Sequence, residues 1–101
     1  MKLINNSPNV VTVAHHGFIY HFSYQTLVAI SRNGIVLRTD KHYSKTTSRH
    51  VNQFVEEWST FDEDGNQHSY QIGQGQLARF NDVSSDEKLN VWSLLVEAYS
   101  Y

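Results

Sequence analysis

Apolar residues in the first forty positions alternate with polar ones or form short β-branched clusters, which is the spacing of β-strands. Four segments have this pattern: residues 10–13, 18–22, 27–30 and 35–38. Asn33-Gly34 lies between the last two segments, and an Asn-Gly pair suits the two positive-φ positions of a type I′ turn. We therefore expect the last two strands to form an antiparallel hairpin.

The second strand is bounded by short polar connections at residues 15–17 and 23–26. Connections of this length favour an antiparallel meander over crossover topologies. Aromatic residues occupy one face of this strand, and Ile19 and His21 occupy the other. Either face is compatible with the core side of a sheet.

The apolar period changes after Tyr43. Apolar side chains then recur at i, i+3, i+4 and i+7, from Val51 to Trp58, which predicts an amphipathic helix over residues 47–58. We expect its apolar stripe to pack on the sheet.

The remaining chain predicts a short strand at 67–72, a glycine-rich break, a helical turn at 76–81 and a final helix. That helix follows a capping-box pattern at 84–87 and is apolar around much of its circumference. A helix with so little polar surface either completes the core or contacts a second copy, so a homodimer through this helix is one expectation.

These elements predict the fold class. We expect one α+β domain over residues 1–101, with an antiparallel β-meander of about four strands, one helix packed on the sheet, and a C-terminal helix. A chain of 101 residues with 40% hydrophobic content is large enough for one modest core.

Composition narrows the functional classes. The formal charge of −2 gives no general attraction to nucleic acid, and the absence of cysteine excludes disulfides and thiolate chemistry. No apolar run reaches membrane-spanning length, and the N-terminal residues lack the apolar segment of a signal peptide. We expect a cytoplasmic protein without membrane contact.

The candidate site is the polar run that leads into the helix predicted at 47–58. Hydroxyl groups, two cations and a histidine exceed what capping one helix requires, and they could present donors to an anion or to a partner's backbone. The candidate binding residues are Tyr43, Ser44, Lys45, Thr46, Thr47, Ser48, Arg49, His50 and Asn52. In the alternative interpretation, Thr46, Thr47 and Ser48 only fix the strand-to-helix connection through backbone hydrogen bonds.

Catalytic, metal and cofactor motifs are not supported. The six histidines lack ligand spacing, although His42 and His50 could converge with Asp40 if the strand end folds over the helix start. The glycines at 73–75 resemble a dinucleotide-binding fingerprint. A βαβ unit also needs a following parallel strand with an acidic residue, and only a helix is predicted after these glycines. No nucleophile elbow occurs either. We expect a protein that is not an enzyme and binds no metal or cofactor.

Nucleic-acid binding is a second hypothesis. Four aromatic residues on one face of the second strand could stack bases beside nearby cations. The aromatic residues are Phe18, Tyr20, Phe22 and Tyr24, and the cations are Arg32, Arg38, Lys41, Lys45 and Arg49. The alternative interpretation is that these aromatic residues belong to the core.

Two runs carry a family resemblance. Residues 22–29 and 43–54 resemble a family of small tailed-bacteriophage proteins of unknown function with an FSYxTxVA and YSxTTSxHxNxF pattern, and the opening segment 5–9 is similar too. The resemblance implies expression in an infected bacterium and an accessory role. It also implies that the polar positions of the second run form the characteristic surface.

We therefore expect a non-catalytic protein that binds and modulates a bacterial host macromolecule, such as a defence, replication or transcription component. The first alternative is a protein that binds single-stranded or structured nucleic acid. The second is a protein that binds a small anionic ligand around His42, Arg49 and His50.

Overall fold

The computed structural model describes residues 2–6, 9–61, 63–81 and 84–99. Ser7 and Pro8, within the opening segment noted above, lie outside the described residues. The strands are β1 (Lys2–Asn6), β2 (Val10–His15), β3 (Phe18–Ser23), β4 (Thr26–Arg32), β5 (Ile35–Thr39) and β6 (Ser69–Ile72). The helices are α1 (Lys45–Trp58), α2 (Gln74–Ala78), the 3₁₀ turn η1 (Arg79–Asn81) and α3 (Ser85–Tyr99).

The strands form one sheet in chain order, from β1 to β6. Neighbouring strands are antiparallel from β1 to β5, and β6 pairs in parallel with β5. The α+β class and the meander are thus confirmed, while the sheet is larger than the four strands predicted. The difference comes from β1, which no alternating pattern marked, and from β6, which the crossover through α1 returns to the sheet edge.

Three hairpin turns in the described part of the meander, those between β2 and β5, have two residues with positive φ. Asn33-Gly34 has φ values of 53° and 79°, as the type I′ prediction requires. His16-Gly17 has values of 51° and 81°. Tyr24-Gln25 has values of 49° and 68° without any glycine, so two side-chain-bearing residues adopt the left-handed conformation in succession.

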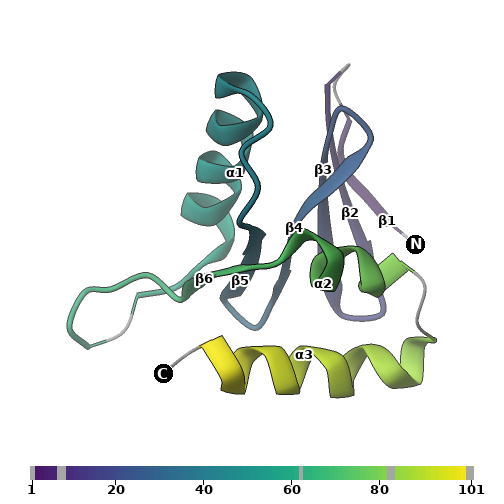
Figure 1. Cartoon of the computed structure of the whole chain (residues 1–101), viewed down its shortest axis with the longest axis vertical. Helices are drawn as coiled ribbons and strands as arrows, with labels where there is room; N and C mark the ends of the chain where they lie inside the picture. The colour runs from purple at the N-terminus through teal and green to yellow at the C-terminus, as the bar shows by residue number, and fades with distance from the viewer. Residues whose placement is uncertain (1, 7–8, 62, 82–83, 100–101) are drawn as a thin grey trace.

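Helices cover both faces of the sheet (Figure 1). On one face α1 packs against a cluster that includes Val28, Val36 and Phe54. On the other face α2, η1 and α3 cover a larger cluster that includes Phe18 and Trp92. The expectation of a single helix on the sheet is therefore incomplete, because the sheet lies between two helical layers.

Both faces of β3 belong to the core, which answers the question left by the sequence. Phe18 and Tyr20 are buried beneath the C-terminal helices, while His21 stacks on Phe54 of α1 with ring centroids 4.4 Å apart. Of the four aromatic residues considered for base stacking, Tyr24 is the only exposed one, at 51%, which favours the core interpretation for Phe18 and Tyr20.

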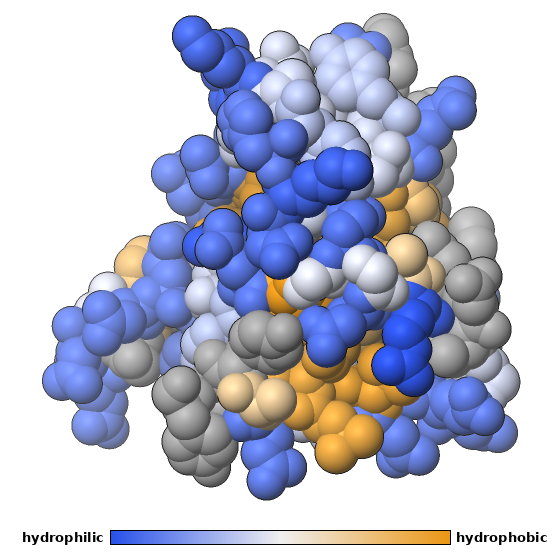
Figure 2. Space-filling model, viewed as in Figure 1, coloured by the Kyte–Doolittle hydropathy of each residue, from blue (hydrophilic) through white to orange (hydrophobic). Residues whose placement is uncertain are grey.

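The outer side of α3 carries exposed apolar side chains. Leu94 is 68% exposed and Leu89 is 46% exposed, and Figure 2 shows an apolar patch over this helix. The inner side contributes Trp92 and Leu95 to the core. The buried side of α3 therefore completes the core, which is one of the two roles expected for this helix. No helix among the described residues is long and apolar enough to cross a membrane.

Candidate functional site

The N-terminus of α1 is fixed by its capping residue. Ser44 has extended backbone, and its Oγ accepts a hydrogen bond from the backbone N–H of Thr47 at 3.0 Å. This is the N-cap arrangement in which a serine satisfies one orphan amide of the first turn. Ser44 therefore has a structural role that accounts for its place in the polar run.

A second set of contacts ties α1 to the sheet. Ser23 of β3 is 2% exposed, and its Oγ lies 3.1 Å from Thr47 Oγ1 and 2.9 Å from His50 Nδ1. These hydrogen bonds join the end of β3 to the first two turns of α1. The Ser23–His50 pair resembles a nucleophile with its base, but burial keeps the hydroxyl from any substrate.

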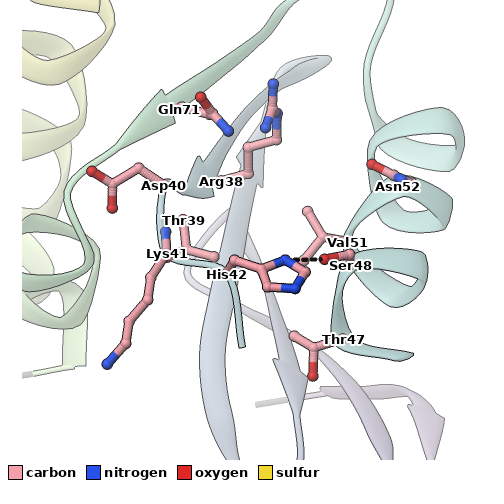
Figure 3. Close-up of a pocket in the computed structure, with 10 residues that line it drawn as sticks. All are labelled: Arg38, Thr39, Asp40, Lys41, His42, Thr47, Ser48, Val51, Asn52 and Gln71. Carbon is pink, nitrogen blue, oxygen red and sulfur yellow. Dashed lines mark hydrogen bonds between the residues drawn. The ribbon is translucent and has the colours of Figure 1, made fainter. Parts of the chain in front are cut away.

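Polar side chains surround a hollow on the other side of the first turns of α1. Its volume is about 120 Å³, and it lies between the carboxyl end of β5, the following loop, β6 and α1 (Figure 3). We call this feature the polar hollow. It is lined by Arg38, Thr39, Asp40, Lys41, His42, Thr47, Ser48, Val51, Asn52 and Gln71.

The βαβ crossover explains why the hollow forms here. Parallel pairing of β5 with β6 brings both carboxyl ends to the same edge, and α1 starts above that edge. Ligand sites in sheets with parallel strands are commonly found outside these ends. The register places Arg38 directly opposite Gln71.

Arg38 is the most distinctive group in the hollow. Its side chain is half-buried, and its Nε donates to Ser69 Oγ at 3.0 Å. Burial lowers the pKa of the guanidinium. Among the described residues, Arg38 forms no ion pair. A partly desolvated cation without an internal counter-charge is costly unless an anion arrives to pair with it.

His42 lies in the hollow beside the helix. Its Nδ1 is 3.1 Å from Ser48 Oγ, and Figure 3 shows Asp40 extending away from this pair. Lys41 points away from the hollow's centre and places its Nζ 4.9 Å from the ring centroid of Tyr43. His42 and Asp40 thus both line the hollow but do not converge on one another. His50 lies outside the lining, where it pairs with Ser23.

His21 forms a buried polar site beneath α1. Its Nδ1 lies 3.1 Å from Thr12 Oγ1, while its Nε2 is buried without a hydrogen-bond partner among the described residues. Desolvation, followed by the nearby charge of His50, lowers the pKa of His21 to about 4. The imidazole is therefore neutral at physiological pH, and it belongs to the core.

The candidate residues divide into three groups in the structure. Ser44, Thr47 and His50 make hydrogen bonds that hold α1 in place. Thr47, Ser48 and Asn52 line the polar hollow. Tyr43, Lys45, Thr46 and Arg49 are exposed outside its lining. The sequence did not separate the structural contacts of this region from its open surface.

Sequence reasoning missed several residues of the hollow as binding candidates, among them Arg38 and Gln71. Arg38 was considered only as a cation near an aromatic face, and Gln71 was not considered at all. Strand alternation could have placed Arg38 on the same face as Val36, towards α1. The parallel pairing that adds Gln71 had no signal in the sequence. Among the described residues, no cluster of three or more His, Cys, Asp or Glu could hold a metal ion.

A family model matches residues 2–72, which is more than two thirds of the chain. The chain belongs to the family of unknown function DUF8033. The matched segment contains the whole sheet, α1 and every residue of the polar hollow, and it ends at the last residue of β6. The helices α2 and α3 lie beyond it. No curated protein and no solved structure matches the chain.

Proposed function

We propose that this DUF8033 protein is a non-catalytic binding protein that docks on a bacterial host macromolecule, such as a protein of a defence, replication or transcription complex. The docking surface is the polar hollow with the exposed part of the α1 N-terminal region. In this account the protein acts in the cytoplasm of an infected cell, which rests on the resemblance to bacteriophage proteins and not on the geometry.

The polar hollow is the observation that carries this proposal. At about 120 Å³ it is smaller than the roughly 300–1,000 Å³ of sites that enclose whole small molecules. A hollow of that size admits one chemical group that protrudes from a larger partner. Its rim is also open, since Asn52, Lys41 and Gln71 are exposed.

Nucleic acid is a weaker candidate for the partner. The aromatic residues that could have stacked bases are mostly inside the core, and Arg32 lies over Phe18 at the opposite end of β4 from the α1 N-terminus. A phosphate backbone is bound by several cations that follow its path. Lys45 and Arg49 provide only two exposed cations on the first turns of α1.

Affinity capture with two neighbouring variants tests the proposal. Asn52→Trp places a bulky neutral side chain at the rim of the hollow, whereas Gln53→Trp makes a similar change at an exposed position outside the lining. Tagged wild type and both variants are incubated with nuclease-treated lysates of infected and uninfected bacteria, and retained proteins are quantified by mass spectrometry.

The proposal predicts one stoichiometric host protein with the wild type and with Gln53→Trp, and at least a tenfold loss with folded Asn52→Trp. Equal retention by both variants would contradict a docking role for the hollow. Retention of nucleic acid from parallel lysates without nuclease treatment, with no host protein retained from the treated ones, would support the nucleic-acid alternative instead.

A further inference from the structure

We infer that the polar hollow binds a carboxylate group of a protein partner and that Arg38 provides the positive charge that pairs with it. This inference rests on the proposed function, because it names the chemistry by which the hollow would recognise a docked protein. It goes beyond that proposal by assigning the ligand group and the residue that selects it.

Arg38 has hydrogen-bond donors that are held in a fixed orientation and can bind a carboxylate. Its Nε is occupied by Ser69 at 3.0 Å, which fixes the orientation of the guanidinium on β5. The two terminal nitrogens have no partner among the described residues. A guanidinium held in one orientation presents its remaining donors as a pair, and the two oxygens of a carboxylate match such a pair.

Uncharged polar side chains lie around the Arg38 guanidinium. Gln71 is the register partner of Arg38 on β6, and Figure 3 shows Asn52 on α1 across the hollow from these strands. Neither carboxamide has a hydrogen-bond partner among the described residues. Both can donate to an oxyanion, so the binding group would be surrounded by donors from three different elements.

The charges that line the hollow favour a ligand group with a single negative charge. The lining contains two cations, Arg38 and Lys41, and one carboxylate, Asp40, while the chain as a whole has a formal charge of −2. A single negative charge is compatible with this balance. A phosphate monoester carries close to two negative charges near neutral pH, and a nucleic-acid backbone carries many, so the local and global fields favour the carboxylate.

The size of the hollow limits how much of the ligand can enter it. A volume of about 120 Å³ leaves room for the end of an acidic side chain or a C-terminal carboxylate, while the remainder of the partner stays outside. Aspartate, glutamate and the chain terminus present this same group. A folded protein partner would insert one such group and cover the exposed rim.

Titration of the full-length ¹⁵N-labelled protein with capped tripeptides tests this inference. The probes are Gly-Glu-Gly, its neutral counterpart Gly-Gln-Gly, and Gly-phosphoserine-Gly, each followed by amide chemical shifts at constant ionic strength. The protein variants are Arg38→Gln and the matched charge change Arg79→Gln, at an exposed position of η1 outside the hollow. Arg38→Lys is a second variant that retains the positive charge at the hollow if Arg38→Gln does not fold.

The inference predicts saturable shifts with the glutamate peptide at residues 38–42, 47–52 and 71, and none with the glutamine peptide. Arg38→Gln weakens the affinity by about tenfold or more, because the charge-assisted hydrogen bonds of the guanidinium are lost, whereas Arg79→Gln leaves it unchanged. Arg38→Lys gives an intermediate loss because an ammonium lacks the paired geometry.

Three results would overturn the inference: equal shifts with the glutamate and glutamine peptides, equal losses in the two Arg→Gln variants, or tenfold tighter binding of the phosphoserine peptide than of the glutamate peptide. The lysate experiment separates this failure from that of the proposed function. Host-protein capture that remains sensitive to Asn52→Trp would retain docking at the hollow and remove only the carboxylate assignment.

Discussion

At the scale of single residues, polar side chains on the α1-facing side of the sheet have two different roles. Ser23 and His21 are buried and serve the packing of α1, with hydrogen bonds to Thr47 and Thr12 respectively. Arg38 lies farther along the same face but reaches a solvent-accessible hollow. Whether a polar side chain on this face belongs to the core or to the hollow therefore depends on its burial and not on its residue type.

His21 makes folding stability depend on pH. Its pKa is about 4 in the folded protein against 6.5 as the ordinary value, so the unfolded chain binds a proton at a higher pH than the folded protein does. The stabilisation is complete above pH 6.5 and decreases as the pH falls towards 4. This shift corresponds to a loss of about 3 kcal/mol in the free energy of unfolding.

Urea denaturation between pH 7.5 and 4 measures this effect. His21→Phe retains a ring against Phe54 and removes the titrating group, so it should flatten the decline in stability between pH 6.5 and 4. His42→Phe, at an exposed histidine, should retain the decline. Parallel pH profiles for wild type and His21→Phe would show that another group controls the acid response.

At the scale of elements, the Tyr24-Gln25 turn is held in a conformation that its residues disfavour. Gln25 has a φ of 68°, where a residue with a Cβ is less stable than glycine by roughly 1–2 kcal/mol. The unfolded-state entropy of glycine offsets about 0.5–1 kcal/mol of that difference. Gln25→Gly should therefore stabilise the protein by roughly 0.5–1 kcal/mol.

The same substitution in a helix provides the control. Gln53→Gly, at an exposed position of α1, should destabilise the protein by about 1 kcal/mol, because glycine disfavours helical backbone. Midpoints of urea denaturation for the two variants should move in opposite directions. Destabilisation by Gln25→Gly would indicate that the Gln25 side chain makes a contact that outweighs the backbone strain.

Element prediction from the sequence succeeded where local periodicity was strong. The stripe from Val51 to Trp58 identified α1, and Asn33-Gly34 identified its hairpin. It was less successful where pairing depends on distant segments: the partner of the segment at 67–72 could not be predicted, because the path of α1 decides that β6 joins β5 in parallel. The polar hollow depends on that pairing, so only its α1 side was foreseen.

At the scale of the whole molecule, the family segment and the remaining helices share one core. The matched residues 2–72 supply the sheet, and α3 covers its second face with Trp92, which is 5% exposed and lies with its ring centroid 5.7 Å from that of Phe18. Trp92→Ala should destabilise the protein by roughly 3–5 kcal/mol. Such a loss approaches the entire stability of a small domain.

Thermal denaturation followed by circular dichroism compares Trp92→Ala with Leu94→Ala. Leu94 is on the same helix but 68% exposed, so its replacement should change stability by no more than about 0.5 kcal/mol. A mild effect of Trp92→Ala would mean that the sheet and α1 fold without the cover that α3 provides. A large effect of Leu94→Ala would instead indicate a contact on the outer face of α3, such as the homodimer.

Photocrosslinking in lysate tests the central claim, that a partner docks at the polar hollow. A photoreactive residue is placed either at position 52, on the rim of the hollow, or at position 94, an exposed apolar site of α3. The account predicts that position 52 cross-links to a host protein and that position 94 does not. Cross-linking of a host protein from position 94 alone would contradict it and assign docking to α3.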